Sequence, residues 1–133
     1  FIKLNIALIG PGNLGDYFDH MVEYLNLSDG YLVRIFCEEV TVGDILILKR
    51  MVNPHTYEWD IKAVGKVVGP YRYEPIFESV DVSDWEMQHC RRVQWIVPNQ
   101  PVRVTGGGAP VRIQRCNDDN PLVIKARELL DQQ

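Results

Sequence analysis

The stretch that decides the fold lies between residues 42 and 97 and contains three apolar segments, VGDILILK (42–49), WDIKAVGKVVGPYRYEP (59–75) and HCRRVQWIV (89–97). These segments are rich in β-branched and aromatic residues, which favours strands. The first has four consecutive apolar residues, so we expect it to be buried on both faces. Gly65 interrupts the second, as a bulge in a curved sheet requires. The sequence therefore predicts consecutive strands in a curved sheet.

The composition is that of an ordinary globular domain. The 133 residues, 46% of them hydrophobic, suffice for one core. We therefore expect residues 1–133 to form a single domain. No apolar run approaches the ~18 residues of a membrane span, so we expect no membrane association. The chain begins at Phe1 without a Met, which indicates a trimmed chain or a piece of a larger protein.

The formal net charge is −4, which limits how the chain could bind nucleic acid. A protein that binds mainly through phosphates needs a basic surface, because its affinity comes largely from the release of counterions. Any nucleic-acid binding must therefore use a local basic patch, or a pocket that recognises bases by stacking.

The three cysteines, Cys37, Cys90 and Cys116, include no Cys-x-x-Cys pair and form no closed disulfide framework. His89 and Cys90 are adjacent and would point to opposite faces of a strand, which is unsuitable for joint metal ligation. We expect no metal and no cofactor. Free thiols are typical of a reducing compartment, so a cytoplasmic location is expected.

A glycine pattern follows the first predicted strand, residues 3–9. Gly10, Gly12 and Gly15 form Gly-x-Gly-x-x-Gly, and acidic residues follow at 38 and 39, as in dinucleotide-binding folds. The alternative is a strand-to-helix turn that needs glycine for its backbone angles. A Rossmann domain requires further βαβ units, whereas residues 41–97 show strands without intervening helices. The topology favours the plain turn.

Helices are predicted near both ends of the chain. The first is indicated by an apolar helical face at i, i+3, i+4 and i+7, formed by Phe18, Met21, Val22 and Leu25. Residues 31–36 follow as a second predicted strand. The second helix begins at Asn120 as cap with Pro121 in its first turn. Its buried stripe is predicted to consist of Leu122, Ala126, Leu129 and Leu130.

Residues 102–104 and 111–113 are predicted to form a hairpin across a triple-glycine turn. No Gly-Lys-Ser/Thr accompanies the glycines, so a flexible hairpin tip is favoured over a phosphate loop. The arginines of this hairpin, Arg103, Arg112 and Arg115, form either a local basic strip or an ordinary solvated face. With five to six strands and flanking helices, the fold class is α+β, with a small, strongly curved mixed sheet or barrel.

No catalytic constellation is evident in the sequence. There is no Gly-x-Ser-x-Gly, and the serine-bearing loops are acidic and lack a nearby histidine. Asp81, Asp84 and Glu86 cluster in sequence, but a solvated acidic loop explains them better than a metal site. We therefore predict that the chain is not an enzyme.

Aromatic residues flank the predicted strands and could enclose a base. Trp95 shares a strand face with two valines and is predicted to be core. Tyr57, Tyr71 and Tyr73 lie in or beside loops and Trp59 opens a strand, so these four are the better candidates for a pocket. Aromatic faces stack on bases with little dependence on net charge.

Residues 40–97 resemble the EVE-like domains of the PUA superfamily, which are relatives of YTH domains. The resemblance rests on VGDILILK, IKAVGKVVGPYRY, Trp85 and HCRRVQWI, and is closest to versions in prokaryotic modification-dependent restriction and defence proteins. It implies a small curved barrel that flips a modified base into an aromatic cage. It also implies that Asn13 contacts a base edge and that Arg91 and Arg92 contact phosphates.

The sequence thus predicts a non-catalytic module that recognises a modified base, with DNA favoured over RNA. Its site would consist of Asn13, Tyr57, Trp59, Tyr71, Tyr73, Arg91 and Arg92. The module would confer specificity on a nuclease or ATPase domain, on the same chain or on a partner. Two alternatives stay open, namely a nucleotide-cofactor domain that uses Gly10, Gly12 and Gly15, and a plain protein-interaction domain.

Overall fold

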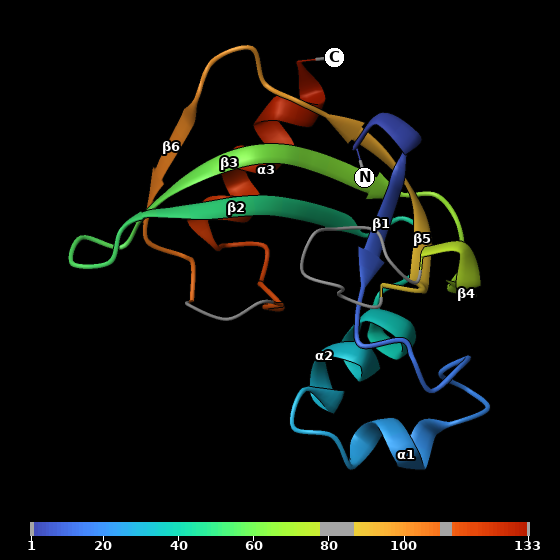
Figure 1. Ribbon diagram of the computed structural model, residues 1–133. Helices are drawn as coiled ribbons and strands as arrows, with labels where there is room; N and C mark the ends of the chain where they lie inside the picture. The colour runs from blue at the N-terminus through green and yellow to red at the C-terminus, as the bar shows by residue number, and fades with distance from the viewer. Residues whose placement is uncertain (1, 78–86, 110–112, 133) are drawn as a thin grey trace. The chain divides into compact units, whose positions relative to one another are not determined.

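A computed structural model describes residues 2–77, 87–109 and 113–132 of the chain. The chain divides into two compact units (Figure 1). Unit 1 comprises Phe1–Asp44 and Val67–Gln94, and unit 2 comprises Ile45–Lys66 and Trp95–Gln133. The described residues form six strands and three α-helices, so the predicted α+β class is confirmed.

Unit 2 contains an antiparallel sheet with β3 (Glu58–Val67) at its centre. β2 (Ile45–Asn53) pairs with one edge of β3, and β6 (Val102–Thr105) pairs with residues 58–61. The register of β2 against β3 shifts between Leu48 and Lys49, where β3 carries one extra residue. Such a bulge changes which side chains face the core. All three segments were predicted as strands, and the structure confirms them.

Helix α3 (Pro121–Asp131) covers one face of this sheet, as its sequence predicts. The Asn120 side chain accepts a hydrogen bond from the backbone N–H of Leu122 at 2.9 Å and caps the helix. Leu122 and Ala126 are buried against Trp59 and Ile61. Burying a leucine contributes about 1.5–3 kcal/mol, so this contact is a main part of the core.

The central strand of unit 1 is β5 (His89–Ile96), whose residues up to Gln94 belong to this unit. β1 (Ile6–Ile9) and the two-residue β4 (Arg72–Tyr73) pair with β5. The described residues of this unit also form three short helices, namely η1 (Ile2–Leu4), α1 (Met21–Leu25) and η3 (Pro75–Phe77). A longer helical segment of the same unit spans residues 30–39.

That segment is α2 (Gly30–Arg34) continued by the π-helix η2 (Ile35–Glu39). The prediction of a strand over residues 31–36 was therefore wrong. The buried residues are Leu32, Val33, Phe36 and Cys37. They recur at i, i+1, i+4 and i+5, which is a helical face. The β-branched composition of the segment favoured a strand, but burial of this face decided for a helix.

The helix predicted from Phe18 to Leu25 is present only over Met21–Leu25, and its orientation differs from the expectation. Tyr24 is fully buried, whereas Val22 is 71% exposed and Phe18 is 53% exposed. An apolar helical face ordinarily packs inward. Here the aromatic side chain between the predicted positions anchors the helix, and the predicted face points outward.

In each unit the three strands form an open sheet, and a closed, strongly curved barrel stays a prediction. The second strand of the predicted hairpin lies largely outside the described residues, which omit 110–112. Within the described part of the chain, no helix is long and apolar enough to cross a bilayer.

Candidate functional site

A row of alternating charges crosses the sheet of unit 2. Arg50 of β2, Asp60 of β3 and Arg103 of β6 lie opposite one another in the strand register. The Asp60 carboxylate accepts a hydrogen bond from Nε of Arg103 at 2.8 Å and one from Nη2 of Arg50 at 3.4 Å. The Asp60 side chain is 6% exposed, whereas those of Arg50 and Arg103 are 65% and 50% exposed. This charge row thus holds two guanidinium groups at the surface through one buried carboxylate.

Hydrogen bonds from the arginines favour the ionised form of Asp60 and of the neighbouring Glu58. The hydrogen bond from Arg103 is the largest cause that lowers the pKa of Asp60 below its ordinary value. Arg103 also donates from Nη1 to Glu58 at 3.1 Å. The pKa of Glu58 is lowered too, first by a hydrogen bond from the hydroxyl of Thr56 and then by Arg103. The carboxylates of Asp60 and Glu58 are therefore ionised at neutral pH.

Tyr57 lies in the turn between β2 and β3, one residue before β3 begins and three residues before Asp60. Its side chain is 57% exposed and its φ of 52° places it in the left-handed region. Its carbonyl accepts a hydrogen bond from the N–H of Gly106 at 2.8 Å, which ties the turn to the end of β6. An exposed ring and exposed guanidinium groups in the same unit are the kinds of side chain that stack on bases and contact phosphates.

Charge is divided unevenly between the two units. Unit 1 contains five Lys and Arg against twelve Asp and Glu, a formal charge of −7. Unit 2 contains nine against six, a formal charge of +3. The net charge of −4 for the whole chain is therefore the sum of an acidic unit 1 and a basic unit 2. Sequence reasoning required a local basic patch, and only the division of the chain into units locates this excess of positive charge.

Trp59, predicted to be part of a pocket, lies in the core of unit 2 and is 3% exposed. The Lys49 ammonium lies 4.1 Å from the centroid of its ring. A Cβ on Gly108 would lie 2.1 Å from Cε2 of the indole, so only glycine fits there. In the part of the chain that the structure describes, the buried Nε1 of Trp59 has no hydrogen-bond partner.

Side chains hold the triple-glycine loop, which the sequence predicts to be flexible. Gln114 donates from Nε2 to the carbonyl of Gly107 and accepts from the N–H of Ala109, both at 2.8 Å. Asn120 donates to the same Gly107 carbonyl at 2.8 Å, and Lys49 donates to the carbonyl of Ala109 at 3.0 Å. Residues 106–109 are therefore fixed over Trp59 and differ from a free hairpin tip.

Tyr71 and Tyr73 belong to unit 1, where their hydroxyl groups hold the turn of Gly10, Gly12 and Gly15. Tyr73 donates to the carbonyl of Gly12 at 2.6 Å, and the hydroxyl of Tyr71 accepts from the N–H of Tyr17 at 3.0 Å. Tyr24 likewise accepts from the N–H of Leu14 at 3.1 Å. Tyr57 and Trp59 lie in unit 2, so the four predicted aromatic residues divide between the units.

His89 is the centre of this network and is fully buried. Its Nε2 lies 2.9 Å from the carbonyl oxygen of Pro11, which can only accept, so Nε2 carries the proton. Nδ1 then accepts from the hydroxyl of Tyr71 at 2.7 Å. Burial lowers the pKa of His89 to about 4, so the ring is neutral at pH 7. His89 therefore joins Pro11 and Tyr71 through hydrogen bonds without placing a charge in the interior of unit 1.

The remaining predicted residues also lie in unit 1, and they differ in exposure. Arg91 is 4% exposed, and its guanidinium donates to the carbonyls of Phe36 and Cys37 at the end of η2. Arg92 and Asn13 are exposed. Arg91 thus stabilises a helix end from inside the unit, whereas Arg92 and Asn13 present their side chains to solvent.

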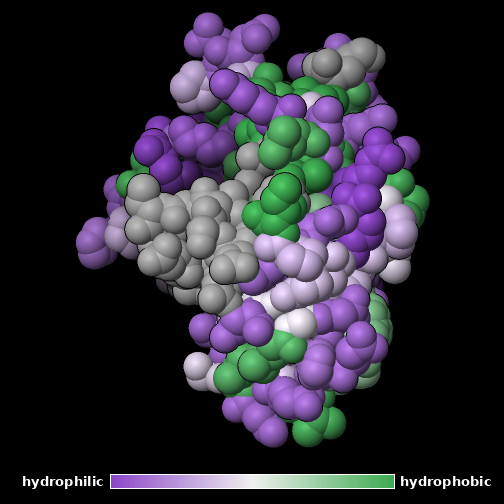
Figure 2. All heavy atoms as spheres, turned by 45° about the vertical axis from the view of Figure 1, so that its right-hand side comes forward, coloured by the Kyte–Doolittle hydropathy of each residue, from purple (hydrophilic) through white to green (hydrophobic). Residues whose placement is uncertain are grey.

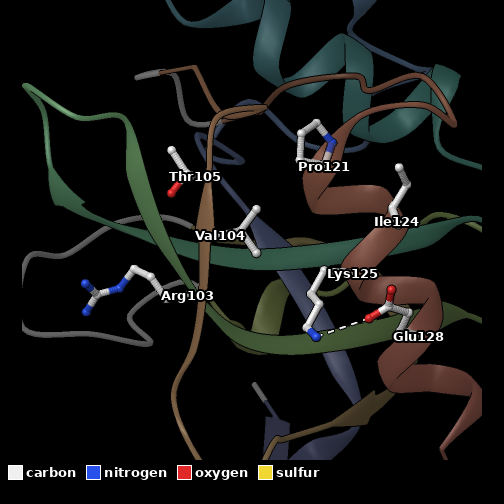
Figure 3. Close-up of a pocket in the computed structure, with 7 residues that line it drawn as sticks. All are labelled: Arg103, Val104, Thr105, Pro121, Ile124, Lys125 and Glu128. Atoms are coloured by element: carbon white, nitrogen blue, oxygen red, sulfur yellow. Dashed lines mark hydrogen bonds and ion pairs between the residues drawn. The ribbon is translucent and has the colours of Figure 1, made fainter.

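A shallow groove of about 400 Å³ lies between β6 and α3 in unit 2 (Figure 3). It is lined by Arg103, Val104, Thr105, Pro121, Ile124, Lys125 and Glu128. Lys125 and Glu128 form an ion pair at 3.1 Å within it, while the Arg103 side chain points away from the helix. The groove lacks a convergent set of polar groups, so it offers less for specific recognition than the charge row does.

Among the described residues, no group of three or more His, Cys, Asp or Glu is placed to hold a metal ion. The acidic cluster Asp81, Asp84 and Glu86, together with Trp85, lies outside the described residues. Cys37 and Cys90 are buried, and burial raises the pKa of both thiols. These thiols are therefore protonated and inert at neutral pH.

Comparison with known proteins gives one match. Residues 2–112 match the model of a family described as "Domain of unknown function (DUF8426)". No curated protein and no solved structure matches the chain. The match covers most of both units.

Proposed function

We propose that this chain, which belongs to the DUF8426 family of domains of unknown function, is a nucleic-acid-binding module that acts through unit 2. The observation that carries the proposal is the charge row, which presents two exposed guanidinium groups in the unit whose formal charge is positive and which also contains the exposed Tyr57. Phosphate contacts dominate the affinity of such modules, and aromatic stacking adds to it.

Arg50 and Arg103 are the proposed phosphate contacts. Asp60 accepts hydrogen bonds from Nε of Arg103 and Nη2 of Arg50, and Glu58 accepts one from Nη1 of Arg103. A guanidinium has five N–H donors, so each arginine keeps donors for a phosphate. Anchoring by a buried carboxylate also lowers the entropy that each side chain loses when it binds. Arg91, which is buried, is not among the contacts that we propose.

Tyr57 is the proposed stacking residue. Its ring is the exposed member of the four predicted aromatic residues, and its backbone is tied to β6. We further propose that the recognised base is modified and that DNA is favoured over RNA, as the resemblance to EVE-like domains implies. On this proposal a curved, PUA-like arrangement of the strands would frame the base, and the module would direct a nuclease or ATPase.

Binding of fluorescently labelled single-stranded oligonucleotides, with and without methylated or hydroxymethylated bases, tests the proposal by anisotropy at low salt. Tyr57→Ala should weaken binding by about 1–3 kcal/mol. Arg50→Ala should weaken binding to all sequences and reduce the slope of log K against log salt by about 1.

Arg72→Ala is the matched control for Arg50→Ala. Arg72 is 47% exposed and pairs with one carboxylate, Glu74, at 3.5 Å, but it lies in the acidic unit. The substitution Arg72→Ala should therefore leave oligonucleotide binding unchanged. Absence of binding by the wild-type chain at low salt would refute the nucleic-acid proposal. Equal binding of modified and unmodified oligonucleotides would refute recognition of the modification alone.

The geometry does not favour a dinucleotide site at Gly10, Gly12 and Gly15. A pyrophosphate needs free backbone N–H groups at the start of a helix. Here the N–H groups of Leu14, Gly15 and Tyr17 already donate to Tyr24, Gly12 and Tyr71. We therefore expect no thermal stabilisation by NAD or FAD, as a scan with either cofactor would measure.

A further inference from the structure

A patch of exposed apolar side chains covers the outer side of α1 in unit 1. Its members, which we call the α1 patch, are Phe18 (53% exposed), Met21 (36%), Val22 (71%) and Leu25 (46%). Leu27 and Tyr31 extend it at 39% and 48%. Figure 2 shows hydrophobic atoms among hydrophilic ones at the bottom of the view, at the height of α1 in Figure 1. Several exposed apolar side chains within one short stretch of chain are more than the isolated ones of an ordinary surface and indicate an interaction site.

The α1 patch is not needed to hold the helix in place. Tyr24 does this from the opposite side, where it is fully buried and its ring contacts those of Tyr17 and His89. Its hydroxyl also bonds the backbone of Leu14 and Gly15. The fold thus explains Tyr24, and it uses one edge of the patch, where the half-exposed Phe18 ring packs edge-on against Tyr17 and Tyr71. Met21, Val22 and Leu25 remain exposed beside it.

The stretch of sequence that contains the α1 patch carries acidic side chains and no Lys or Arg. Residues 4–33 contain no Lys or Arg but include four carboxylates, Asp16, Asp19, Glu23 and Asp29. The patch therefore repels phosphates and anionic lipids. A symmetric contact between two copies would bring these carboxylates together, which opposes a homodimer through this face.

We propose that the α1 patch docks a polypeptide surface with an apolar centre and a rim of Lys and Arg, such as one face of a basic amphipathic helix. Apolar burial would supply the affinity, and the complementary charges would select the partner. The surface lies in unit 1 and the charge row in unit 2, so this inference does not rest on the proposed nucleic-acid binding.

Two synthetic amphipathic helical peptides with the same leucine face test the proposal, one flanked by Lys and the other by Glu. Fluorescence anisotropy should show binding of the Lys-flanked peptide alone, weakening as salt is raised. Val22→Asp should weaken this binding about tenfold. Ile124→Asp, at an apolar side chain in unit 2 that is 48% exposed, is the control and should leave it unchanged.

A charge-reversed variant, Asp19→Lys with Glu23→Lys, separates docking from non-specific adsorption. It should bind the Glu-flanked peptide and lose the Lys-flanked one. Equal binding of both peptides, binding of neither, or a wild-type dimer in sedimentation that Val22→Asp abolishes would each overturn the proposal. Thermal melting of every variant shows whether it is folded, and substitutions at these exposed positions should leave it so.

Discussion

The two units hold their glycine loops by different chemistry. In unit 1 tyrosine hydroxyls and a neutral His89 hold the turn of Gly10, Gly12 and Gly15. In unit 2 an ammonium and two amide side chains hold Gly107 and Ala109 over Trp59. The turn in the acidic unit is thus held by hydroxyl groups and a neutral imidazole, and the loop in the basic unit is held by two amides and one ammonium. A single net charge for the chain describes neither unit.

The largest effect is expected from Trp59→Ala in unit 2. The ring lies in the core and beneath both Gly108 and Lys49, so its removal leaves a cavity. Loss of a buried tryptophan costs about 3–5 kcal/mol of unfolding free energy. Urea denaturation followed by circular dichroism measures it. A loss below about 1 kcal/mol, which is little more than a surface substitution costs, would show that Trp59 does not support the core.

A somewhat smaller effect is expected from pH, through His89 in unit 1. Burial lowers its pKa to about 4, below the value of about 6.5 in the unfolded chain. The unfolded chain therefore binds a proton that the folded chain does not, and stability falls as pH drops from about 6.5 to about 4. The difference in pKa corresponds to about 3 kcal/mol at most.

Denaturation between pH 6.5 and 5 isolates this effect, since most carboxylates stay ionised there. His89→Gln cannot take up a proton and should show a flatter dependence on pH in this window. His55→Gln, in the turn of unit 2, is the control because His55 is exposed. An unchanged slope for His89→Gln would refute the account of a buried neutral imidazole.

The smallest effect on stability is expected from Tyr57→Gly. The left-handed φ of 52° strains a tyrosine but not a glycine, while the greater freedom of glycine in the unfolded chain acts against it. The two terms nearly cancel, so the unfolding free energy should change by less than about 1 kcal/mol. Loss of oligonucleotide binding with unchanged stability would separate the binding role of Tyr57 from any structural one.

Much of the sheet was predictable because its strands carry local patterns. Segments 42–49, 59–68 and 89–97 gave β2, β3 and β5, and Asn120 with Pro121 gave the start of α3. The α2 segment was not, since its spacing competed with a β-branched composition. The wrong prediction for this segment reflects a tertiary effect, because burial of one helical face outweighs the local preference for a strand.

The charge row was beyond sequence reasoning for a physical reason. Arg50 and Arg103 are far apart in the chain, and only pairing of both β2 and β6 with β3 sets them on either side of Asp60. The sequence indicated Arg103 as part of a possible basic strip, but nothing local indicated Arg50. Closeness in sequence was equally poor as a guide to the aromatic residues. Trp59 is buried and Tyr57 is exposed, although they are two residues apart and were both predicted to line a pocket.

The contact between Gly108 and Trp59 makes the protein its own spectroscopic reporter. Indole emission depends on the polarity around the ring, and here the ring lies against the Gly108 backbone, the Lys49 ammonium and the apolar side chains of the core. Trp59 is one of three tryptophans in the chain, so a variant in which the other two are replaced by phenylalanine isolates its emission. Displacement of residues 106–109 would admit water to an Nε1 that has no partner within the described residues, and the emission of Trp59 would move to longer wavelength. A tryptophan in the core thereby records the position of a loop at the surface.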